Sequence, residues 1–215
     1  MNKLRNKMTF GIVVLMLLVS YNANAQKRTF QRVKAGYSHG MPTMNINQLG
    51  EMKTKSSHGF YANYSFEVRF AERFAYFIDA LYEQMHSEFT PTEPHTSIKN
   101  TNGNLNMALG LKFYPMYNLG IYVGGFGGFN LVNNVVISSD TMKKGDTNDL
   151  KEALEKSLKG GYGLRFGADY RFVDNWFVEV SYSWGDNQKI KQAKTHKQIG
   201  NYRLSYISAG IGYRF

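Results

Sequence analysis

The chain of 215 residues is basic and aromatic, with 26 Lys and Arg against 16 Asp and Glu, 15 Phe, 15 Tyr and no Cys. The lack of Cys excludes a disulfide scaffold, a thiolate metal site and a Cys nucleophile. A mean hydropathy of −0.40 excludes a bundle of membrane-spanning helices, because each would need about 20 apolar residues. The length suits one domain, since a barrel reaches about 200–250 residues as a single unit.

The N-terminal segment has the features of a secretory signal peptide. Basic residues at its start precede an unbroken apolar run at 10–19, and Ala23 and Ala25 stand at the positions that signal peptidase requires. The apolar run is too short to span a bilayer as a helix. We therefore expect cleavage after Ala25, which makes residues 1–25 the signal peptide and residues 26–215 the mature domain.

The mature chain alternates apolar and polar side chains with a period of two, which is typical of strands whose two faces meet different environments. Eight segments show this pattern: residues 30–38, 60–70, 74–82, 104–113, 119–131, 162–172, 176–184 and 207–215. Most of them have the length of a tilted strand that crosses a membrane, about 9–11 residues. The pattern predicts eight strands.

The connections between these segments alternate in length. The segments are joined by short turns at 71–73, 115–118 and 173–175, and elsewhere by about 16 to 26 residues, which is longer than ordinary hairpin loops. Transmembrane barrels have this arrangement, with short periplasmic turns and long external loops. Within the longest connection, a stripe of leucines and i,i+4 charge pairs predicts a short helix near residues 149–159.

The alternation alone leaves open which face lies outside. In a soluble lipocalin-like carrier the apolar set would line a cavity, whereas in a membrane barrel it would face lipid. The second to seventh segments carry no charge at their apolar positions, as expected where a charge at the bilayer midplane costs about 2–4 kcal/mol. Aromatic residues also gather near the segment ends, where interfacial girdles lie: Phe60, Phe70, Phe74, Tyr82, Phe113, Phe172, Trp176 and Trp184.

The final segment adds a resemblance. Residues 207–215, ending on Tyr213-Arg-Phe215, resemble the C-terminal signature by which bacterial outer-membrane barrels are recognised for insertion. The alternating body resembles small OmpA/OmpX-type barrels and the broad outer-membrane beta-barrel family that includes PorT-like proteins. The resemblance implies an all-β, eight-stranded antiparallel up-and-down transmembrane β-barrel in the outer membrane of a Gram-negative-type bacterium, inserted by the barrel-assembly machinery.

With lipid outside, charged strand residues point into the barrel. Six are basic and five acidic: Arg32, Lys34, Glu67, Arg69, Asp79, Glu83, Lys112, Arg165, Asp169, Arg171 and Glu179. Unpaired buried charges are prohibitive, so the near-balance predicts a paired network. Such a network could form an ion path, but a barrel of eight strands is just wide enough for its own side chains to fill. We expect a packed polar core, with inward glycines giving the long side chains room.

The sequence offers little chemistry for catalysis. The five histidines lie in predicted loops or at strand rims: His39, His58, His86, His95 and His196. None has metal-ligand spacing. A lipid-modifying enzyme with a Ser nucleophile and a His base, from His86-Ser87 or His95-Thr-Ser97, is the alternative. We expect no enzyme, metal or cofactor.

The external loops are expected to carry any specificity. Lys189, Lys191, Lys194 and Lys197 form a basic group without an acid, which could bind an anionic partner such as lipopolysaccharide or be a solvated loop. We expect a monomeric structural or interaction protein that acts through four external loops on lipid, lipopolysaccharide or an envelope protein, and not on nucleic acid. A narrow channel is a further alternative.

Overall fold

The computed structural model describes residues 29–47, 50–91, 96–139, 144–157, 160–192 and 197–215. The predicted signal peptide lies outside these ranges. The described elements are β1 (Thr29–Gly40), β2 (Thr43–Ile46), β3 (Gly50–Ala71), β4 (Phe74–Pro91), β5 (Thr96–Met116), β6 (Leu119–Ser139), α2 (Lys144–Ser157), β7 (Tyr162–Val173), β8 (Trp176–Lys191) and β9 (Gln198–Arg214).

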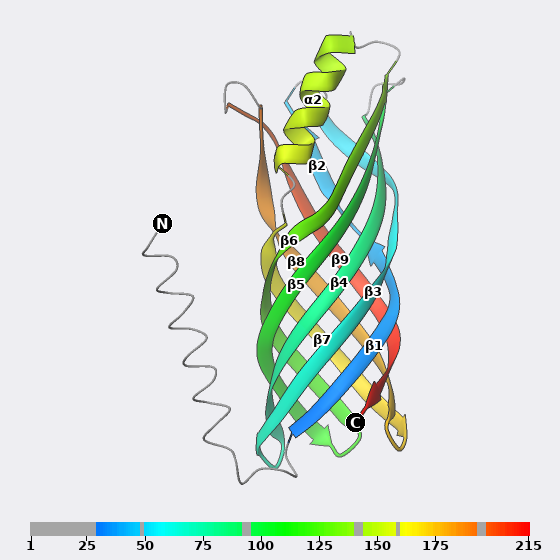
Figure 1. Cartoon of the computed structure of the whole chain (residues 1–215), viewed down its shortest axis with the longest axis vertical. Helices are drawn as coiled ribbons and strands as arrows, with labels where there is room; N and C mark the ends of the chain where they lie inside the picture. The colour runs from blue at the N-terminus through cyan, green and yellow to red at the C-terminus, as the bar shows by residue number, and fades with distance from the viewer. Residues whose placement is uncertain (1–28, 48–49, 92–95, 140–143, 158–159, 193–196) are drawn as a thin grey trace.

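The strands form one closed antiparallel barrel (Figure 1). Sequential strands pair with each other, and β1 closes the ring against β9, from Arg32 opposite Arg214 to Gly40 opposite Tyr206. The short strand β2 continues the position of β1, because both lie between β3 and β9. Pro42 separates them, since proline has no N–H to donate to the ladder. The ring therefore has eight strand positions, which confirms the predicted fold.

The strands are longer than the sequence pattern indicated. β3, β5 and β6 have 22, 21 and 21 residues, so most of the residues assigned to long loops continue the strands instead. The connection between β6 and β7 does contain a helix, α2, which begins five residues before the predicted start at Asp149. No helix in the described part of the chain is long and apolar enough to cross a membrane.

The outward face of the barrel changes from apolar to polar toward its upper end. In β4 every second residue from Phe74 to Tyr82 is apolar and faces outward, whereas the inward face stays largely apolar, from Phe77 to Met85 and Phe89, which are 4%, 1% and 0% exposed. Beyond Tyr82 the outward positions are polar, as at His86, which is exposed. We call this upper part, the described residues within 43–58, 84–103, 132–157 and 186–204, the crown.

The lower part of the barrel carries an apolar outer belt. Leu109, Ile121 and Val178 are 55%, 48% and 44% exposed on this outer face. Aromatic rings contact one another near its lower edge, as in the Phe74–Phe113 pair, whose centroids are 5.1 Å apart. The apolar stretch of β4 from Phe74 to Tyr82 matches the length that a tilted strand needs to cross a bilayer.

A charge on this belt is expected to destabilise the barrel. Leu109→Arg places a cation in the middle of the belt. We expect this variant to lower the free energy of unfolding by about 2–4 kcal/mol, because a charge at the bilayer midplane is poorly solvated. Urea unfolding in phosphatidylcholine vesicles, followed by tryptophan fluorescence, measures the loss. The matched control is Asn134→Arg, on an exposed outward position of the crown, which we expect to cost less than about 1 kcal/mol. Equal losses for both variants would contradict the assignment of the belt to lipid.

Candidate functional site

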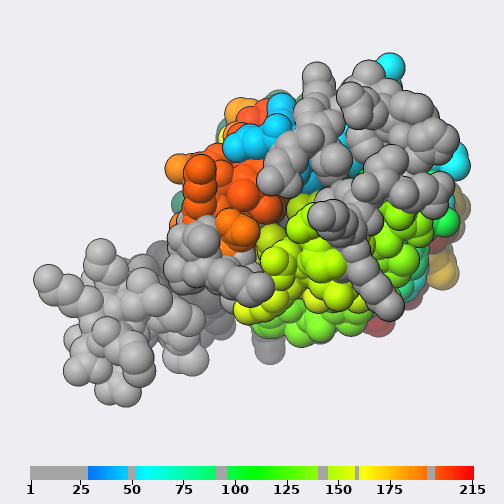
Figure 2. Space-filling model, turned by 90° about the horizontal axis from the view of Figure 1, so that it is seen from above, coloured from blue at the N-terminus to red at the C-terminus, as the bar shows by residue number. Residues whose placement is uncertain are grey.

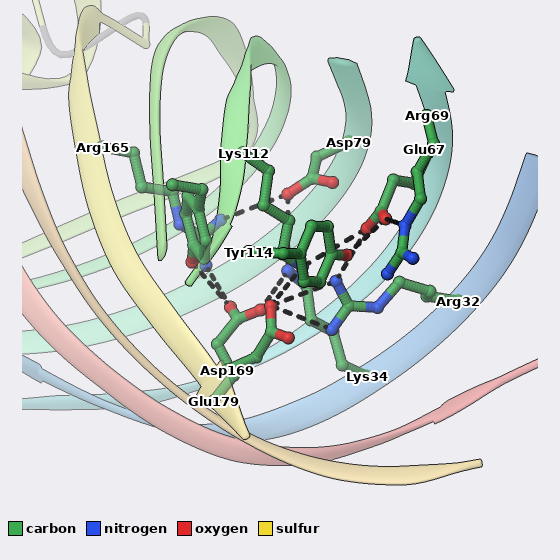
Figure 3. A network of polar contacts seen from close by, with 11 residues as sticks. Arg32, Lys34, Glu67, Arg69, Asp79, Lys112, Tyr114, Arg165, Asp169 and Glu179 are labelled. Carbon is green, nitrogen blue, oxygen red and sulfur yellow. Dashed lines mark hydrogen bonds and ion pairs between the residues drawn. The ribbon is translucent and has the colours of Figure 1, made fainter. Parts of the chain in front are cut away.

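Four buried charges from four strands form a closed ring inside the barrel (Figure 3). Arg32 on β1 contacts Glu67 on β3 at 3.3 Å and Asp169 on β7 at 3.1 Å. Lys112 on β5 contacts the same two carboxylates. Each base thus bridges both acids, and the group is neutral. We call it the Glu67 ring.

A second ring repeats this arrangement with different strands. Lys34 on β1 contacts Asp79 on β4 at 3.4 Å and Glu179 on β8 at 2.7 Å. Arg165 on β7 contacts Glu179 at 3.3 Å and Asp79 at 4.0 Å. This Glu179 ring is also neutral. All eight side chains of the two rings are at most 7% exposed.

The rings brace the barrel across its lumen. The Glu67 ring joins β1 and β3 to β5 and β7, and the Glu179 ring joins β1 and β4 to β7 and β8. Burying charges is costly unless every charge is paired with good geometry. Because each carboxylate here meets two cations, the rings hold opposite walls at a fixed spacing and occupy the space between them.

Three of the predicted interior residues lie outside the two rings, and two of them, Arg69 and Arg171, lie at the end with the short turns. The side chain of Arg69 is 15% exposed, and its Nε lies 3.9 Å from Glu67. Arg171 is half-buried and donates to the carbonyl of Tyr117 at 3.4 Å. Its guanidinium carbon also lies 4.3 Å from the centroid of the aromatic ring of Tyr117. These two arginines line the lower mouth of the barrel.

Two tyrosines complete the rings and were missed by reasoning from charge alone. The hydroxyl of Tyr114 donates to Glu67, and that of Tyr122 donates to Glu179 Oε1 at 2.9 Å. Both occupy inward positions of the period-two pattern, two residues after Lys112 and Gly120, so the alternation contained the signal. Several inward glycines make room for the aromatic side chains of neighbouring strands. A Cβ at Gly167, for example, would meet the aromatic ring of Tyr122.

Glu83 is the exception among the predicted interior acids. It is fully buried, and its Oε1 accepts a hydrogen bond from Ser38 at 2.9 Å. Among the described residues no basic side chain forms an ion pair with it. Asn102, Asn104 and Asn106 of the neighbouring β5, each at most 8% exposed, line the same cavity, with Asn104 directly opposite Glu83. The interior therefore changes from charged to neutral polar groups at this level.

The interior of the crown is an apolar cluster covered by α2. The cluster unites residues from β2 to β9 with one face of the helix: Met44, Ile46, Met52, Phe89, Ile98, Val135, Leu150, Leu154, Ile190 and Tyr202. Leu154 is fully buried. We call this group the apolar plug.

The helix α2 also takes the place of a missing strand. β7 pairs with β6 only up to Gly127, so the upper parts of β6 and β8 have no strand between them. On the β6 side Asn133 Nδ2 donates to the carbonyl of Glu155 at 2.9 Å, and on the β8 side the N–H of Lys191 donates to Ser157 Oγ at 2.9 Å. Figure 2 shows α2 between these two walls.

Two of the four lysines predicted in a basic loop lie in strand β8 instead. β8 extends to Lys191, so Lys189 and Lys191 are exposed on its outer face while Ile190 between them is buried in the plug. Lys197 is exposed directly before β9, and its carbonyl accepts from the N–H of Gln192 at 2.9 Å. Lys194 lies outside the described residues.

The candidate His–Ser pair on β4 does not form a catalytic dyad. His86 and Ser87 are neighbours on one strand, so their side chains point to opposite faces of the barrel. His86 Nδ1 lies 2.9 Å from Thr101 Oγ1 on the outer face, whereas Ser87 Oγ lies 2.8 Å from Ser57 Oγ inside. His95 falls outside the described part of the chain.

The C-terminal signature residues lie at the lower rim of the barrel. Tyr213 stands opposite Trp176 and Val33, with ring centroids of Tyr213 and Trp176 5.2 Å apart. The ring centroids of Phe215 and Tyr213 are 5.2 Å apart. The backbone N–H of Phe215 donates to the carbonyl of Gln31 at 2.8 Å. Strand closure and the aromatic belt therefore meet at this end.

Removal of one ring cation tests the energetics of the rings. Lys112→Met keeps the length of the side chain but leaves Glu67 and Asp169 with one cation between them. Breaking a buried pair costs about 3–5 kcal/mol, and urea unfolding in vesicles measures this loss. The control is Lys55→Met, whose side chain is 65% exposed beside Glu88, and which we expect to cost less than about 1 kcal/mol. A loss for Lys112→Met no larger than the control would contradict the bracing role.

Comparison with solved structures finds barrels of similar size. OprG from Pseudomonas aeruginosa is 13% identical, with 87% of this chain and 96% of that chain covered and a TM-score of 0.46. Ail from Yersinia pestis is 12% identical, with 87% and 99% covered and a TM-score of 0.45. Neisserial surface protein A is 17% identical, with 86% and 97% covered and a TM-score of 0.44.

The family comparison covers most of the sequence. No curated protein matches the chain. Residues 24–188, however, match the family described as outer membrane protein beta-barrel domain. This match agrees with the closed ring of strands, the apolar outer belt and the paired interior. The chain therefore belongs to the outer membrane protein beta-barrel domain family, and it is an eight-stranded barrel of the Gram-negative outer membrane.

Proposed function

We propose that this barrel is a structural and interaction protein of the outer membrane, which presents its crown at the cell surface and does not conduct solutes. The observation that carries the proposal is the filled lumen: two charge rings occupy the membrane-spanning part, and the apolar plug occupies the crown. A barrel whose described interior is filled in this way is expected to act through the surface that it presents.

The size of the internal cavities supports a closed lumen. Three cavities inside the described part of the barrel have volumes of about 40, 20 and 10 Å³. A water molecule takes up about 30 Å³ in the liquid, so each of these spaces is too small for a continuous column of water. The larger hollows, such as that beside Phe166 and Ile207, lie on the outer wall.

The crown offers a basic outer surface for an anionic partner. Lys189 and Lys191 on β8 and Lys53 and Lys55 on β3 are exposed in pairs at i,i+2 spacing. Lys55 is partly compensated by Glu88 at 3.3 Å. Lys189 and Lys191 form no ion pair within the described residues, and Lys197 lies nearby in the sequence, so this surface favours the phosphates of lipopolysaccharide as its partner, through electrostatic attraction.

The filled lumen predicts an absence of steady conductance. Purified barrel inserted in planar bilayers is expected to give no reproducible openings, because rings and plug lie in series. A variant with residues 144–157 replaced by a Gly-Ser linker lacks α2 but keeps both rings, and we expect it to stay closed as well. Reproducible single-channel steps from the unmodified protein would overturn the proposal in favour of a narrow channel.

The partner is tested by the lysine pairs. In Lys189→Gln/Lys191→Gln, affinity for lipopolysaccharide immobilised on a sensor surface is expected to fall roughly thirtyfold, because each of the two lysines near an anionic surface contributes about 1 kcal/mol. Lys53→Gln/Lys55→Gln removes the same charge at the same spacing and is expected to change affinity by less than about threefold. Equal losses would indicate a general charge effect, and no loss would refute the β8 pair as the binding surface.

A further inference from the structure

Glu83 stands out because the barrel otherwise pairs its deeply buried acids. Glu67, Asp79, Asp169 and Glu179 each contact at least two cations, whereas Glu83 is 0% exposed and lacks an ion pair within the described residues. Its Oε2 meets no donor there at hydrogen-bonding geometry, although the hydroxyl of Tyr206 acts on the carboxylate. The basic group whose charge acts on Glu83 is Arg165, which is already shared between Asp79 and Glu179.

A small cavity adjoins this carboxylate. It has a volume of about 40 Å³ and is lined by Glu83, Asn102, Asn104, Gln188 and other residues of β4 to β9. The amide oxygens of Asn102, Asn104 and Gln188 are buried there without hydrogen-bond partners in the described structure. Leaving a buried polar atom without a partner costs about 1–3 kcal/mol, so such a group of acceptors calls for an occupant.

The chemistry of the lining selects the occupant. The unpartnered atoms at this cavity are oxygens of Glu83, of the three amides and of the Tyr202 and Tyr206 hydroxyls, and such oxygens can coordinate a cation. Glu83 is the buried carboxylate of the lining and balances a single positive charge, whereas tight Ca²⁺ sites use several carboxylates. The other carboxylate, Asp186, is half-buried and already accepts from the N–H of Tyr162. The volume admits a bare ion with a water molecule, or an ammonium group. We propose that this cavity binds a small monovalent cation, an alkali-metal ion or an ammonium group, between Glu83 and the amide oxygens of Asn102, Asn104 and Gln188.

The wall beside the cavity carries a second carboxylate. Gly160, Gly161 and Asp186 also line the cavity, at the level where β7 begins and α2 no longer fills the space between β6 and β8. Gln188 Nε2 donates to the carbonyl of Gly160 at 2.6 Å, and the N–H of Tyr162 donates to Asp186 Oδ1 at 3.3 Å. The second carboxylate at this rim attracts cations toward the site.

Thermal unfolding in different salts tests the site independently of the proposed surface role. For mature barrel in detergent micelles, we expect the melting temperature to be about 2–5 °C higher in NaCl, KCl or methylammonium chloride than in N-methyl-D-glucamine chloride of equal ionic strength, because a ligand that binds only the folded state stabilises it. A comparison of NaCl and KCl with methylammonium chloride shows whether the site prefers an alkali-metal ion or an ammonium group. Equal melting temperatures in all four salts would refute the site.

Two variants locate the effect. Glu83→Gln is expected to lose the salt-specific shift, whereas Glu88→Gln, which removes an acid on the outer face beside Lys55, is expected to keep it. Asn104→Asp adds a second carboxylate at nearly constant volume and is expected to gain a stabilising response to CaCl₂. A shift that persists in Glu83→Gln, or an Asn104→Asp barrel indifferent to Ca²⁺, would contradict the assignment.

A direct observation applies even if Glu83→Gln does not fold. Crystals of the unmodified barrel grown in RbCl are expected to show an anomalous scattering peak beside Glu83 Oε2, since Rb⁺ replaces K⁺ at oxygen sites. A cavity filled by water without such a peak would overturn the proposal for alkali-metal ions. Methylammonium stabilisation alone would then assign the site to an ammonium group.

Discussion

The structure depends on the need to pair every backbone N–H and C=O in a medium that cannot hydrogen-bond to them. The pairing of β1 with β9 meets this need by closing the ring, and closure fixes a narrow lumen. Everything inside follows from that width: charges from opposite walls come within contact distance, so they must be paired. Where β7 ends and the ring would open, α2 supplies donors and acceptors to the free edges of β6 and β8 instead.

The interior is organised in levels along the barrel axis. The two neutral rings brace the membrane-spanning part, a level of amides and Glu83 follows, and the apolar plug ends the series. The sequence of levels matches the surroundings, because the larger apolar cluster lies inside the crown, and the apolar outer belt surrounds the part of the barrel that holds the charged rings. Each level thus satisfies the same rule in a different solvent.

The alternation of residues predicted the fold and the orientation of most interior charges, but not the height of the barrel. In β4 the outward apolar residues end at Tyr82, while Met85 and Phe89 continue the inward face, so the apolar period-two pattern of the outer face ends although the strand continues. The partners within the rings could not be predicted, because the stagger of the closed barrel decides which charges meet. The contacts of α2 with strand edges depend equally on the unequal lengths of β6, β7 and β8.

The composition of the apolar plug has a consequence for the kinetics of assembly. Its members come from different hairpins, as Phe89, Leu154 and Ile190 illustrate, so they can meet only after every hairpin tip has crossed the bilayer. Withdrawal of any one hairpin then requires the whole plug to separate first and its polar outer surface to re-enter lipid. Separation of the plug therefore adds to the barrier for withdrawal, and the lifetime of the folded barrel is set by this barrier as well as by equilibrium stability.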